Sequence, residues 1–467
     1  MINRLLAPRP AETGAKTAGS RMLSRNVLRV EWDTLRSFTY CAFAFKIYAA
    51  IMPRTRAMKS RNPPDSRDKV YGVEYGEKSR AAALAQRRFE EMYETQPAVF
   101  RAPGRVNLIG EHTDYNDGFV MPAAIGICTY AAVLPSDNSQ LTVHSTDLNE
   151  TCELDLRALP RGNTGKWSDY VAGVAAVLQS SGHGLRGAHI VIASDIPIGT
   201  GLSSSAALEV VVAIALLSIS NLQLGRVAIA KACQRAENEY TGTRCGIMDQ
   251  FASCLGEAGC ALYLDCRSLE YSLVPIPGNV RIVICDTGVK HELAAGEYNR
   301  RREECETGVE YLKRFIPGIS ALRDVSMEQL LRHSSGLSDT CFRRCRHVIS
   351  ENQRVRQAAE ALKQSGLHGF GELMYESHAS LRDDYEVSCP ELDRLVEIAR
   401  GIDGVFGARM TGGGFGGSTV NLVAEEAVTE FRSQVAQKYE EATLKPPGIL
   451  VCSPVAGASE IPAGGRA

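Results

Sequence analysis

The chain has 467 residues, of which 44% are hydrophobic and 23% are charged, a composition typical of a globular protein rather than a collagen-like, coiled-coil or mainly disordered one. Its 52 basic and 54 acidic residues leave a net charge of −2, so no excess of positive charge favours nucleic-acid binding. The nearest candidate for a membrane span, residues 38–52, is too short to cross a bilayer and contains Lys46.

The 14 cysteines are scattered along the chain and form no Cys-x-x-Cys pair. This spacing argues against a zinc ribbon or a thioredoxin-type redox motif. The sequence also shows no pattern typical of a secretory signal peptide. We therefore expect reduced thiols and a cytoplasmic location.

The first eighty residues differ from the rest of the chain. Residues 1–29 contain six basic residues and a single acidic one. Such a segment can be an organellar transit peptide, a basic arm, or the product of a start codon upstream of the true one, with Met52 and Met58 as internal starts. Targeting is the less favoured hypothesis, because Pro8 and Pro10 weaken an amphipathic helix. We expect residues 1–80 to lie outside the fold.

The first element expected within the fold is a helix over residues 79–93. Ala83, Leu84, Phe89 and Met92 recur there with the spacing of an amphipathic helix. After it, strand-like and helix-like segments alternate, which predicts an α/β fold. No repeat with a period of 20 to 50 residues indicates a solenoid.

A dense polar cluster follows a short apolar stretch within residues 101–116. Glu111, His112 and Asp114 lie within four residues of each other. Several donors and acceptors in one loop suit a polyhydroxylated ligand, because each sugar hydroxyl both donates and accepts. Two alternatives stay open: a polar turn around residues 116–118, and a metal site, which is less favoured because consecutive side chains diverge.

A glycine- and serine-rich loop spans residues 197–206. It follows a strand pattern over 189–193 and precedes an apolar stretch, 206–219, that predicts a buried helix. Free N–H groups and the positive end of the helix dipole favour a phosphate there, and the serines offer hydroxyl groups and a possible Mg²⁺ ligand. The loop is not a Walker motif, because no Gly-Lys-Ser/Thr follows. The alternative is a serine N-cap on a core helix.

Two acidic residues stand out between residues 234 and 251. Glu237 lies near the end of a helical stretch. Asp249 follows a turn at Gly246 and precedes the apolar Phe251, so we expect it to be partly buried. A half-buried carboxylate near a cation is a candidate general base, although Asp249 could instead cap a helix.

The last segment of interest is the glycine-rich run 410–419. Gly412, Gly414 and Gly417 formally fit the Gly-x-Gly-x-x-Gly pattern of dinucleotide-binding proteins. A strand pattern follows, whereas the dinucleotide fingerprint requires a helix at this point. The run is therefore predicted to be a glycine loop between two strands.

Taken in chain order, these segments resemble the galactokinase family. This family belongs to a superfamily of small-molecule kinases that includes homoserine, mevalonate and phosphomevalonate kinases. Residues 104–116 (GRVNLIGEHTDYN) resemble the galactokinase signature, and residues 199–206 resemble the phosphate loop of the superfamily. The remaining motifs match, in the family's order, at residues 245–250, 385–393 and 409–417. The resemblance covers about residues 82–455.

The resemblance implies a role for each matching residue. Asp249 resembles the catalytic base that faces the anomeric hydroxyl of the sugar, and Arg105 resembles its cationic partner. The residues that resemble sugar ligands are Glu111, His112, Asp114, Gly246 and Tyr298. The residues that resemble the ATP-binding set are Gly199, Gly201, Ser203 and Ser204, with Trp167 near the nucleotide, and the Mg²⁺ ligands would be Ser205 and Glu237.

The resemblance also implies an architecture of two α/β domains with the active site in the cleft between them. The first, over residues 81–277, would be a ribosomal-protein-S5-like domain that binds sugar and ATP. The second, over 278–456, would be a ferredoxin-like domain that contributes the glycine loop, and 457–467 would form a tail. The boundary is expected near residues 275–279, where Pro-Ile-Pro-Gly-Asn breaks the pattern.

The activity implied is transfer of a phosphoryl group from ATP to the anomeric hydroxyl of D-galactose, by a monomer that binds neither nucleic acid nor membranes. Two alternatives stay open. A sibling kinase would act on N-acetylgalactosamine or arabinose, although the sequence His-Thr-Asp-Tyr-Asn at 112–116 favours galactose. A non-catalytic galactose sensor is disfavoured because residues 203–207 keep an intact phosphate loop.

Overall fold

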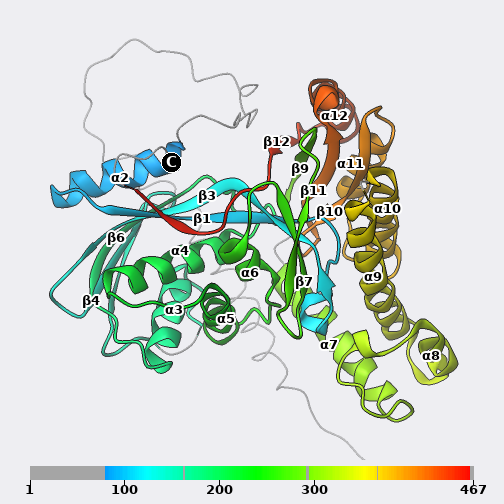
Figure 1. The fold of residues 1–467 in the computed structure, drawn as a ribbon, viewed down its shortest axis with the longest axis horizontal. Coiled ribbons are helices and arrows are strands. Elements are labelled where there is room, and N and C mark those ends of the chain that lie inside the picture. Colours follow the sequence, from blue (N-terminus) through cyan, green and yellow to red (C-terminus); the bar gives the residue numbers. More distant parts are fainter. Residues whose placement is uncertain (1–78, 161–162, 291–293, 365, 463–467) are drawn as a thin grey trace, which may run out of the picture. The chain divides into compact units, whose positions relative to one another are not determined.

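The computed structural model describes residues 79–160, 163–290, 294–364 and 366–462 (Figure 1). The proposed extension over residues 1–80 lies outside the described residues except for its last two. Ser79 and Arg80 begin the first described helix, where the Ser79 side chain accepts a hydrogen bond from the backbone N–H of Ala82. The helix expected over 79–93 is therefore present and begins at a serine cap.

The helices that the structure describes alternate along the chain with single strands or runs of strands. Their bounds are α2 Arg80–Tyr93, α3 Ser168–Ser180, α4 Ser204–Ile219, α5 Arg226–Ala236, α6 Met248–Leu255, α7 Ala294–Leu312, α8 Met327–Arg332, α9 Asp339–Lys363, α10 Leu367–Asp383, α11 Pro390–Arg400 and α12 Val428–Thr443. A short π-helical segment, Glu237–Thr241, continues α5.

The strands form three sheets, with the orders β13-β1-β3-β6-β4-β5, β10-β11-β9-β12 and β2-β7-β8. Their bounds are β1 Ala98–Asn107, β2 Phe119–Val120, β3 Pro122–Pro135, β4 Gln140–Ser145, β5 Glu150–Asp155, β6 Ala188–Ser194, β7 Cys260–Asp265, β8 Tyr271–Pro275, β9 Val280–Lys290, β10 Val405–Thr411, β11 Gly416–Ala424, β12 Gly448–Cys452 and β13 Ser459–Ile461.

The six-stranded sheet has helices on both faces (Figure 1). On one face, Phe89 of α2 packs in a small apolar cluster with residues of β3 and β6. On the other face lie α3 to α6, and α4 is buried along most of its length. The strand predicted over 189–193 and the helix predicted over 206–219 are thus confirmed as β6 and α4. The loop between them brings the start of α4 next to β1, where the backbone N–H of Arg105 donates to the carbonyl of Leu202.

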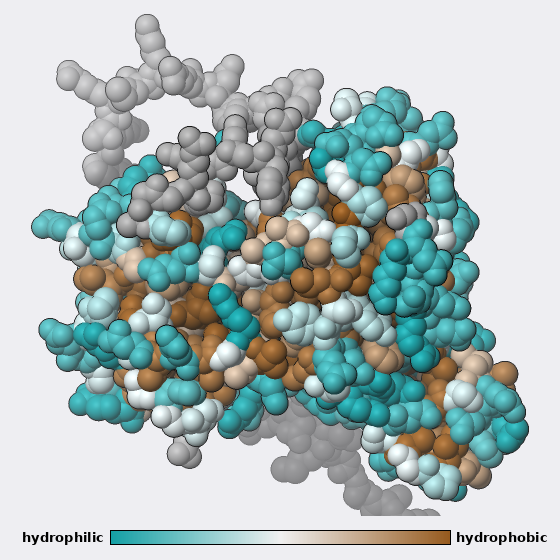
Figure 2. Space-filling model, in the orientation of Figure 1, coloured by the Kyte–Doolittle hydropathy of each residue, from teal (hydrophilic) through white to brown (hydrophobic). Residues whose placement is uncertain are grey.

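The four-stranded sheet is antiparallel throughout, and β9 pairs with both β11 and β12. Helices α11 and α12 pack on its outer face, α10 packs along the edge strand β10, and the inner face of the sheet joins the main hydrophobic core. Figure 2 shows that hydrophilic residues cover the outer side of these helices, whereas hydrophobic residues gather between them and the first sheet. The α/β class and the ferredoxin-like sheet are therefore confirmed, and the glycine-rich run lies between β10 and β11, as predicted.

The end of the described chain returns to the first sheet. Residues Ser459–Ile461, expected to belong to a tail, form β13 and pair antiparallel with β1. Residues 276–279 connect β8 to β9, the first strand of the second sheet. The exact domain boundary near this connection stays a prediction. None of the helices in the described part of the chain is both long and apolar enough to span a membrane.

Candidate active site

A cavity of about 250 Å³ opens where three segments meet: residues 104–116 (the signature loop), the start of α4, and the glycine loop over residues 410–419. Its lining residues come from segments more than 300 residues apart in the sequence. They are Arg105, Glu111, His112, Asp114, Gly199, Gly201, Leu202, Ser203, Ser204, Ser205, Glu237, Thr243, Cys245, Gly246, Met248, Asp249, Tyr298, Gly412 and Gly413. The structure thus brings together every residue for which the sequence predicts a site role, with the exception of Trp167.

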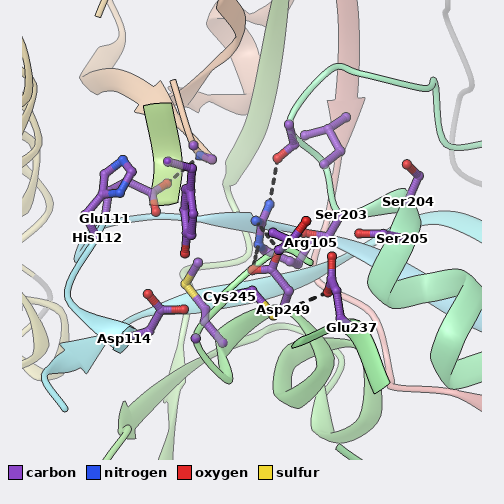
Figure 3. A pocket seen from close by; sticks show the side chains of 18 of the residues that line it. Arg105, Glu111, His112, Asp114, Ser203, Ser204, Ser205, Glu237, Cys245 and Asp249 are labelled. Carbon is purple, nitrogen blue, oxygen red and sulfur yellow. Dashed lines mark hydrogen bonds and ion pairs between the residues drawn. The ribbon is translucent and has the colours of Figure 1, made fainter. Parts of the chain in front are cut away.

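An ion pair between Arg105 and Asp249 lies at the centre of the cavity (Figure 3). Arg105 Nε and Nη2 donate to the two carboxylate oxygens of Asp249, each at 2.7 Å. Arg105 Nη1 donates to the carbonyl of Gly201 at 2.7 Å, and Ser203 Oγ donates to Asp249 Oδ2 at 2.5 Å. The Arg105 side chain is 5% exposed and that of Asp249 is 27% exposed, so the carboxylate keeps access to the cavity.

The guanidinium of Arg105 stays charged in this environment. Burial alone lowers its pKa, but the carboxylates of Asp249 and Glu111 outweigh that effect and raise the pKa above its usual value. The bidentate geometry fixes the orientation of the Asp249 carboxylate as well as its charge. A carboxylate held in this way can accept a hydrogen bond from a hydroxyl group that enters the cavity.

The start of α4 forms the wall beside this ion pair. Ser203 precedes the helix with a backbone φ of 62°, and Ser204 and Ser205 begin it. The preceding loop is held from both sides, because Thr200 Oγ1 donates to the carbonyl of Pro197 and Ser418 Oγ donates to the carbonyl of Thr200, each at 2.9 Å. The first N–H groups of a helix carry partial positive charge, so this wall can bind phosphate oxygens.

Glu237 lies on the α5 side of the cavity, near Ser205 (Figure 3). Gln250 Nε2 donates to its carboxylate at 2.6 Å and also donates to Glu209 at 3.0 Å. Burial and the charge of Asp249 raise the pKa of Glu237 to about 7. The other groups that stabilise this carboxylate, Cys245 and Ser205, are uncharged.

A buried carboxylate with uncharged partners fits a divalent cation. Among the described residues, no group of three or more His, Cys, Asp or Glu side chains is placed to hold a metal ion. Mg²⁺ needs no such group, because it keeps several waters and binds one or two protein ligands together with phosphate oxygens of the substrate. Glu237 and the Ser205 hydroxyl therefore fit Mg²⁺ bound together with a nucleotide.

The predicted sugar ligands occupy the opposite side of the cavity (Figure 3). Glu111 is buried, and its carboxylate accepts hydrogen bonds from Asn107 Nδ2 at 2.9 Å and from the backbone N–H of Gly412 at 2.6 Å. Burial raises the pKa of Glu111, although nearby arginines act against this shift. Glu111 thus connects the signature loop to the glycine loop of the second sheet.

His112 has a backbone φ of 63°, lies next to Glu111 and lines the cavity (Figure 3). Its Nδ1 forms a hydrogen bond with the hydroxyl of Tyr115 at 2.9 Å. Burial lowers the pKa of His112 well below its usual value, so the ring is neutral near pH 7. Burial and the charge of Asp249 raise the pKa of Asp114 to about 7.

Gly246 and Tyr298 complete this side. A Cβ atom on Gly246 would lie 2.0 Å from Asp114 Oδ2, so only glycine fits beside that carboxylate. Tyr298 reaches the cavity from α7, and its ring centroid lies 5.6 Å from that of His112 and 5.2 Å from that of Tyr115. The short match that identified Tyr298 in the sequence therefore marks a residue that lines the cavity.

Trp167 does not line the cavity. It precedes α3, its ring packs against the main core, and its Nε1 donates to Glu150 at 2.9 Å. A nucleotide would contact Trp167 only through a part that extends beyond this cavity. The prediction for Trp167 depended on an isolated aromatic residue, whereas each other prediction came from a motif or, for Tyr298, from a short local match.

Several lining residues received no role from the sequence. Cys245 lies next to Gly246 within a motif, and Gly412 and Gly413 belong to the glycine loop, so the motifs themselves could have indicated them. Glu209 does not line the cavity but lies behind it, fully buried, and its Oε1 has no hydrogen-bond partner among the described residues. The signal for Glu209 was a single acidic residue in an otherwise apolar stretch of α4.

Comparison with known families agrees with this geometry. Residues 87–135 match the family model described as the galactokinase galactose-binding signature. Residues 169–257 match the GHMP kinases N-terminal domain, and residues 358–441 match the GHMP kinases C-terminal domain. The three matched regions contain most of the residues that line the cavity.

Individual proteins give the same result. The chain is 48% identical to a galactokinase from Roseiflexus sp. (strain RS-1), over 78% of this chain and 93% of that protein. It is 47% identical to a galactokinase from Chloroflexus aurantiacus, over 79% of this chain and 95% of that protein. Among solved structures, the Lactococcus lactis galactokinase complexed with galactose matches with a TM-score of 0.78 and 37% identity, covering 81% of this chain and 99% of that one.

More distant structures share the fold alone. A mevalonate kinase matches with a TM-score of 0.55 and 22% identity over 77% of this chain. The cavity, the three family matches and the high identity to galactokinases over most of their length lead to one conclusion. This chain belongs to the galactokinase family of the GHMP kinases.

Proposed function

We propose that this protein transfers the γ-phosphoryl group of ATP to the anomeric hydroxyl of D-galactose, giving α-D-galactose 1-phosphate and ADP. The observation that carries the proposal is the Arg105–Asp249 ion pair, which lies between the start of α4 and the polar side chains of the signature loop. A hydroxyl held against Asp249 would therefore face a phosphoryl group held at α4.

Asp249 would accept the proton of the anomeric hydroxyl. Among the described residues, its Oδ1 accepts a hydrogen bond from Arg105 Nε only, whereas Oδ2 accepts from Arg105 and Ser203. Oδ1 therefore has room for the sugar hydroxyl, and Arg105 stabilises the carboxylate before the proton arrives. General base catalysis of this kind contributes about 10²- to 10⁴-fold in rate. In a dissociative transition state Asp249 would act in part by orienting the sugar.

Phosphoryl transfer depends mainly on positioning and on neutralising charge. The start of α4, with Gly199, Gly201, Ser203 and Ser204, would hold the phosphates through backbone N–H groups and hydroxyls. Ser205 and Glu237 would hold Mg²⁺, which, when bound, neutralises part of the phosphate charge.

The sugar would be oriented by residues of the signature loop and their neighbours. Asp114 and the neutral ring of His112 offer acceptors and a donor toward the cavity, and Gly246 leaves room for Asp114. Glu111 and Tyr298 complete the pocket. Contacts to hydroxyls at several positions would favour one epimer, because an unpaired buried polar group penalises the wrong one.

We also propose that the protein acts as a monomer in the cytoplasm. The cysteines in the described part of the chain are all free thiols, many of them buried, which is the usual state in a reducing compartment. Gel filtration and fractionation would test these two points.

The proposal is tested by ADP release from purified protein with Mg·ATP and, in separate reactions, galactose, glucose, arabinose, N-acetylgalactosamine or no sugar. We expect ADP release with galactose. Release mainly with arabinose or N-acetylgalactosamine would move the protein to a sibling activity with the same mechanism. Binding of galactose without ADP release would overturn the kinase proposal and favour a sensor.

A further inference from the structure

Helix α9 contacts the backbone of residues 110–119 through three buried polar side chains. His347 Nε2 lies 3.1 Å from the carbonyl oxygen of Glu111, and Glu351 Oε1 accepts a hydrogen bond from the N–H of Gly110 at 2.9 Å. Asn352 Oδ1 accepts from the N–H of Phe119 at 2.8 Å. Residues 347 and 351 are one helical turn apart and therefore share a face of α9.

The signature loop needs such support because its backbone is irregular. Gly110 has a φ of 102° and His112 a φ of 63°, so the chain enters the left-handed region twice within three residues. For His112, which carries a Cβ atom, this conformation is unfavourable in isolation. The two hydrogen bonds from α9 lie on the segment between these two positions. They hold the turn that directs Glu111 and His112 into the cavity.

The chemistry of His347 is defined by its two partners. A carbonyl oxygen can only accept, so Nε2 carries the hydrogen and donates to Glu111. Nδ1, which lies 2.9 Å from Ser380 Oγ, then accepts from that hydroxyl. Burial lowers the pKa of His347 to about 4, which agrees with a neutral ring. The ring orientation is therefore fixed by Ser380 on one side and by the loop on the other.

Glu351 is anchored in a similar way. Ser377 Oγ donates to Glu351 Oε1 at 2.6 Å, and Arg354 Nε donates to Oε2 at 2.7 Å. The side chain is fully buried, so its single carboxylate joins the loop, α9 and α10. Both carboxylate oxygens of Glu351 are held by side chains on helices, so the carboxylate keeps a fixed position next to the loop.

We propose that His347 and Glu351 are positioning residues that hold residues 110–112 in the shape required for sugar binding. Neither residue lines the cavity, so each acts through Glu111 and His112 rather than on the sugar itself. The inference rests on the proposed function, since it assigns the sugar to this side of the cavity. It predicts that damage to these residues weakens galactose binding and leaves ATP binding nearly unchanged.

The test compares His347→Leu, His347→Gln and Ser380→Ala with the wild-type enzyme in steady-state kinetics. Gln places an amide N–H near the position of Nε2 and can still donate to Glu111. We expect His347→Leu to raise KM for galactose about 10- to 100-fold, with KM for ATP changed less than about twofold. His347→Gln should recover most of that loss, and Ser380→Ala should shift KM for galactose in the same direction by a smaller factor.

Val348→Ala is the matched control, because Val348 is buried on the same helix in a hydrophobic cluster outside the cavity. Val348→Ala should lower Tm, and any change in KM for galactose should be matched by the same factor in KM for ATP. Equal changes in both KM values for His347→Leu, or no recovery with His347→Gln, would overturn the inference. If His347→Leu fails to fold, the inference is tested with His347→Gln and Ser380→Ala instead. An unchanged KM for galactose in Ser380→Ala would then count against the inference. A wild-type enzyme inactive on galactose would instead overturn the proposed function.

Discussion

Asp249 is the residue on which the proposed chemistry depends. It accepts three hydrogen bonds from two side chains, yet it remains open to the cavity. Replacement by Asn keeps the shape of the side chain but removes the charge and the ability to take a proton. We expect Asp249→Asn to lower kcat by at least about 10²-fold.

Circular dichroism and a melting curve of Asp249→Asn would check that the fold is intact, and calorimetry would check that galactose still binds. Full activity in a folded Asp249→Asn variant would contradict the base assignment. Loss of galactose binding together with kcat would instead assign Asp249 to orientation of the sugar.

Gly246 gives a second test at this scale. A methyl group at this position would overlap Asp114 Oδ2, at 2.0 Å, and would push that carboxylate away from the sugar side of the cavity. We expect Gly246→Ala to raise KM for galactose about tenfold or more while the protein stays folded. Gly184→Ala is the control, because a Cβ there meets no atom within 4 Å. Equal effects of both variants would refute the explanation.

The raised pKa of Asp114 predicts a pH dependence of stability. Burial and the charge of Asp249 raise this pKa from 3.8 to about 7, so in the folded protein ionisation is disfavoured. Well below pH 4 the Asp114 carboxyl is protonated in both the folded and the unfolded state. Above about pH 7 it is ionised in both states, and burial of the charge then destabilises the folded state relative to the unfolded one. Stability without ligand should therefore fall between these two values.

Asp114→Asn removes that cost, since Asn never ionises. We expect the Tm of the variant minus that of the wild type to increase between about pH 5 and about pH 8 in the absence of ligand. Differential scanning calorimetry would measure it. A difference that is constant with pH would show that Asp114 is not responsible.

Residues within motifs could be predicted from the sequence, and those outside could not. The signature loop and the phosphate loop each concentrate several lining residues in one short stretch, and local spacing makes such stretches visible. Glu209 and His347 act through contacts with residues 41 and 236 positions away. No local pattern encodes a contact of that kind, so only the folded chain shows it.

At the scale of elements, the glycine loop between β10 and β11 packs against the phosphate loop. Gly412 has a φ of 86°, and a Cβ atom there would lie 2.8 Å from the carbonyl oxygen of Gly201. We expect Gly412→Ala to displace the phosphate loop and to raise KM for ATP about tenfold.

Gly413→Ala is a matched control for Gly412→Ala. Its Cβ would meet only Tyr298, at an ordinary contact distance of 3.6 Å. Kinetics at varied ATP would separate the two variants. An unchanged KM for ATP in Gly412→Ala would show that the two loops are not mechanically coupled.

Elements with a clear hydrophobic pattern were predictable: α2 and β6 from their spacing, α4 from a continuous apolar stretch, and the strands around the glycine loop from the strand pattern that follows it. The helices α7 to α9 were not, although α9 is 25 residues long. Their charged residues form ion pairs within and between helices, such as Arg344 with Glu304 at 2.7 Å. Because these charged residues lie on the buried faces of the helices, they interrupt the periodic apolar residues by which an amphipathic helix is identified in a sequence.

At the scale of the whole described molecule, β13 closes the free edge of the first sheet. It pairs with β1, Arg101 Nε donates to Ser459 Oγ at 3.2 Å, and Arg226 donates to the carbonyl of Ala458. Removal of residues 458–467 would expose the edge of β1. We expect a Tm lower by several degrees and a greater tendency to aggregate.

Light scattering during thermal unfolding would measure both effects. Removal of residues 463–467 alone, which lie outside the described residues, serves as the control and isolates the contribution of residues 458–462. An equal Tm for both truncations would show that β13 adds nothing to the sheet. The pairing of β13 with β1 was not predictable, because three residues carry too short a pattern to indicate a strand or its partner.

The place of β13 in the chain also has a consequence during synthesis. β1 ends at Asn107, but its partner begins only at Ser459, 352 residues later. At translation rates of about 5 to 20 residues per second, roughly 20 to 70 s pass between synthesis of β1 and synthesis of β13, and during this time one edge of β1 has no partner strand. During that interval the unpaired edge of β1 can form hydrogen bonds with strands of other proteins. Newly made protein should therefore depend on chaperones far more than the finished enzyme does.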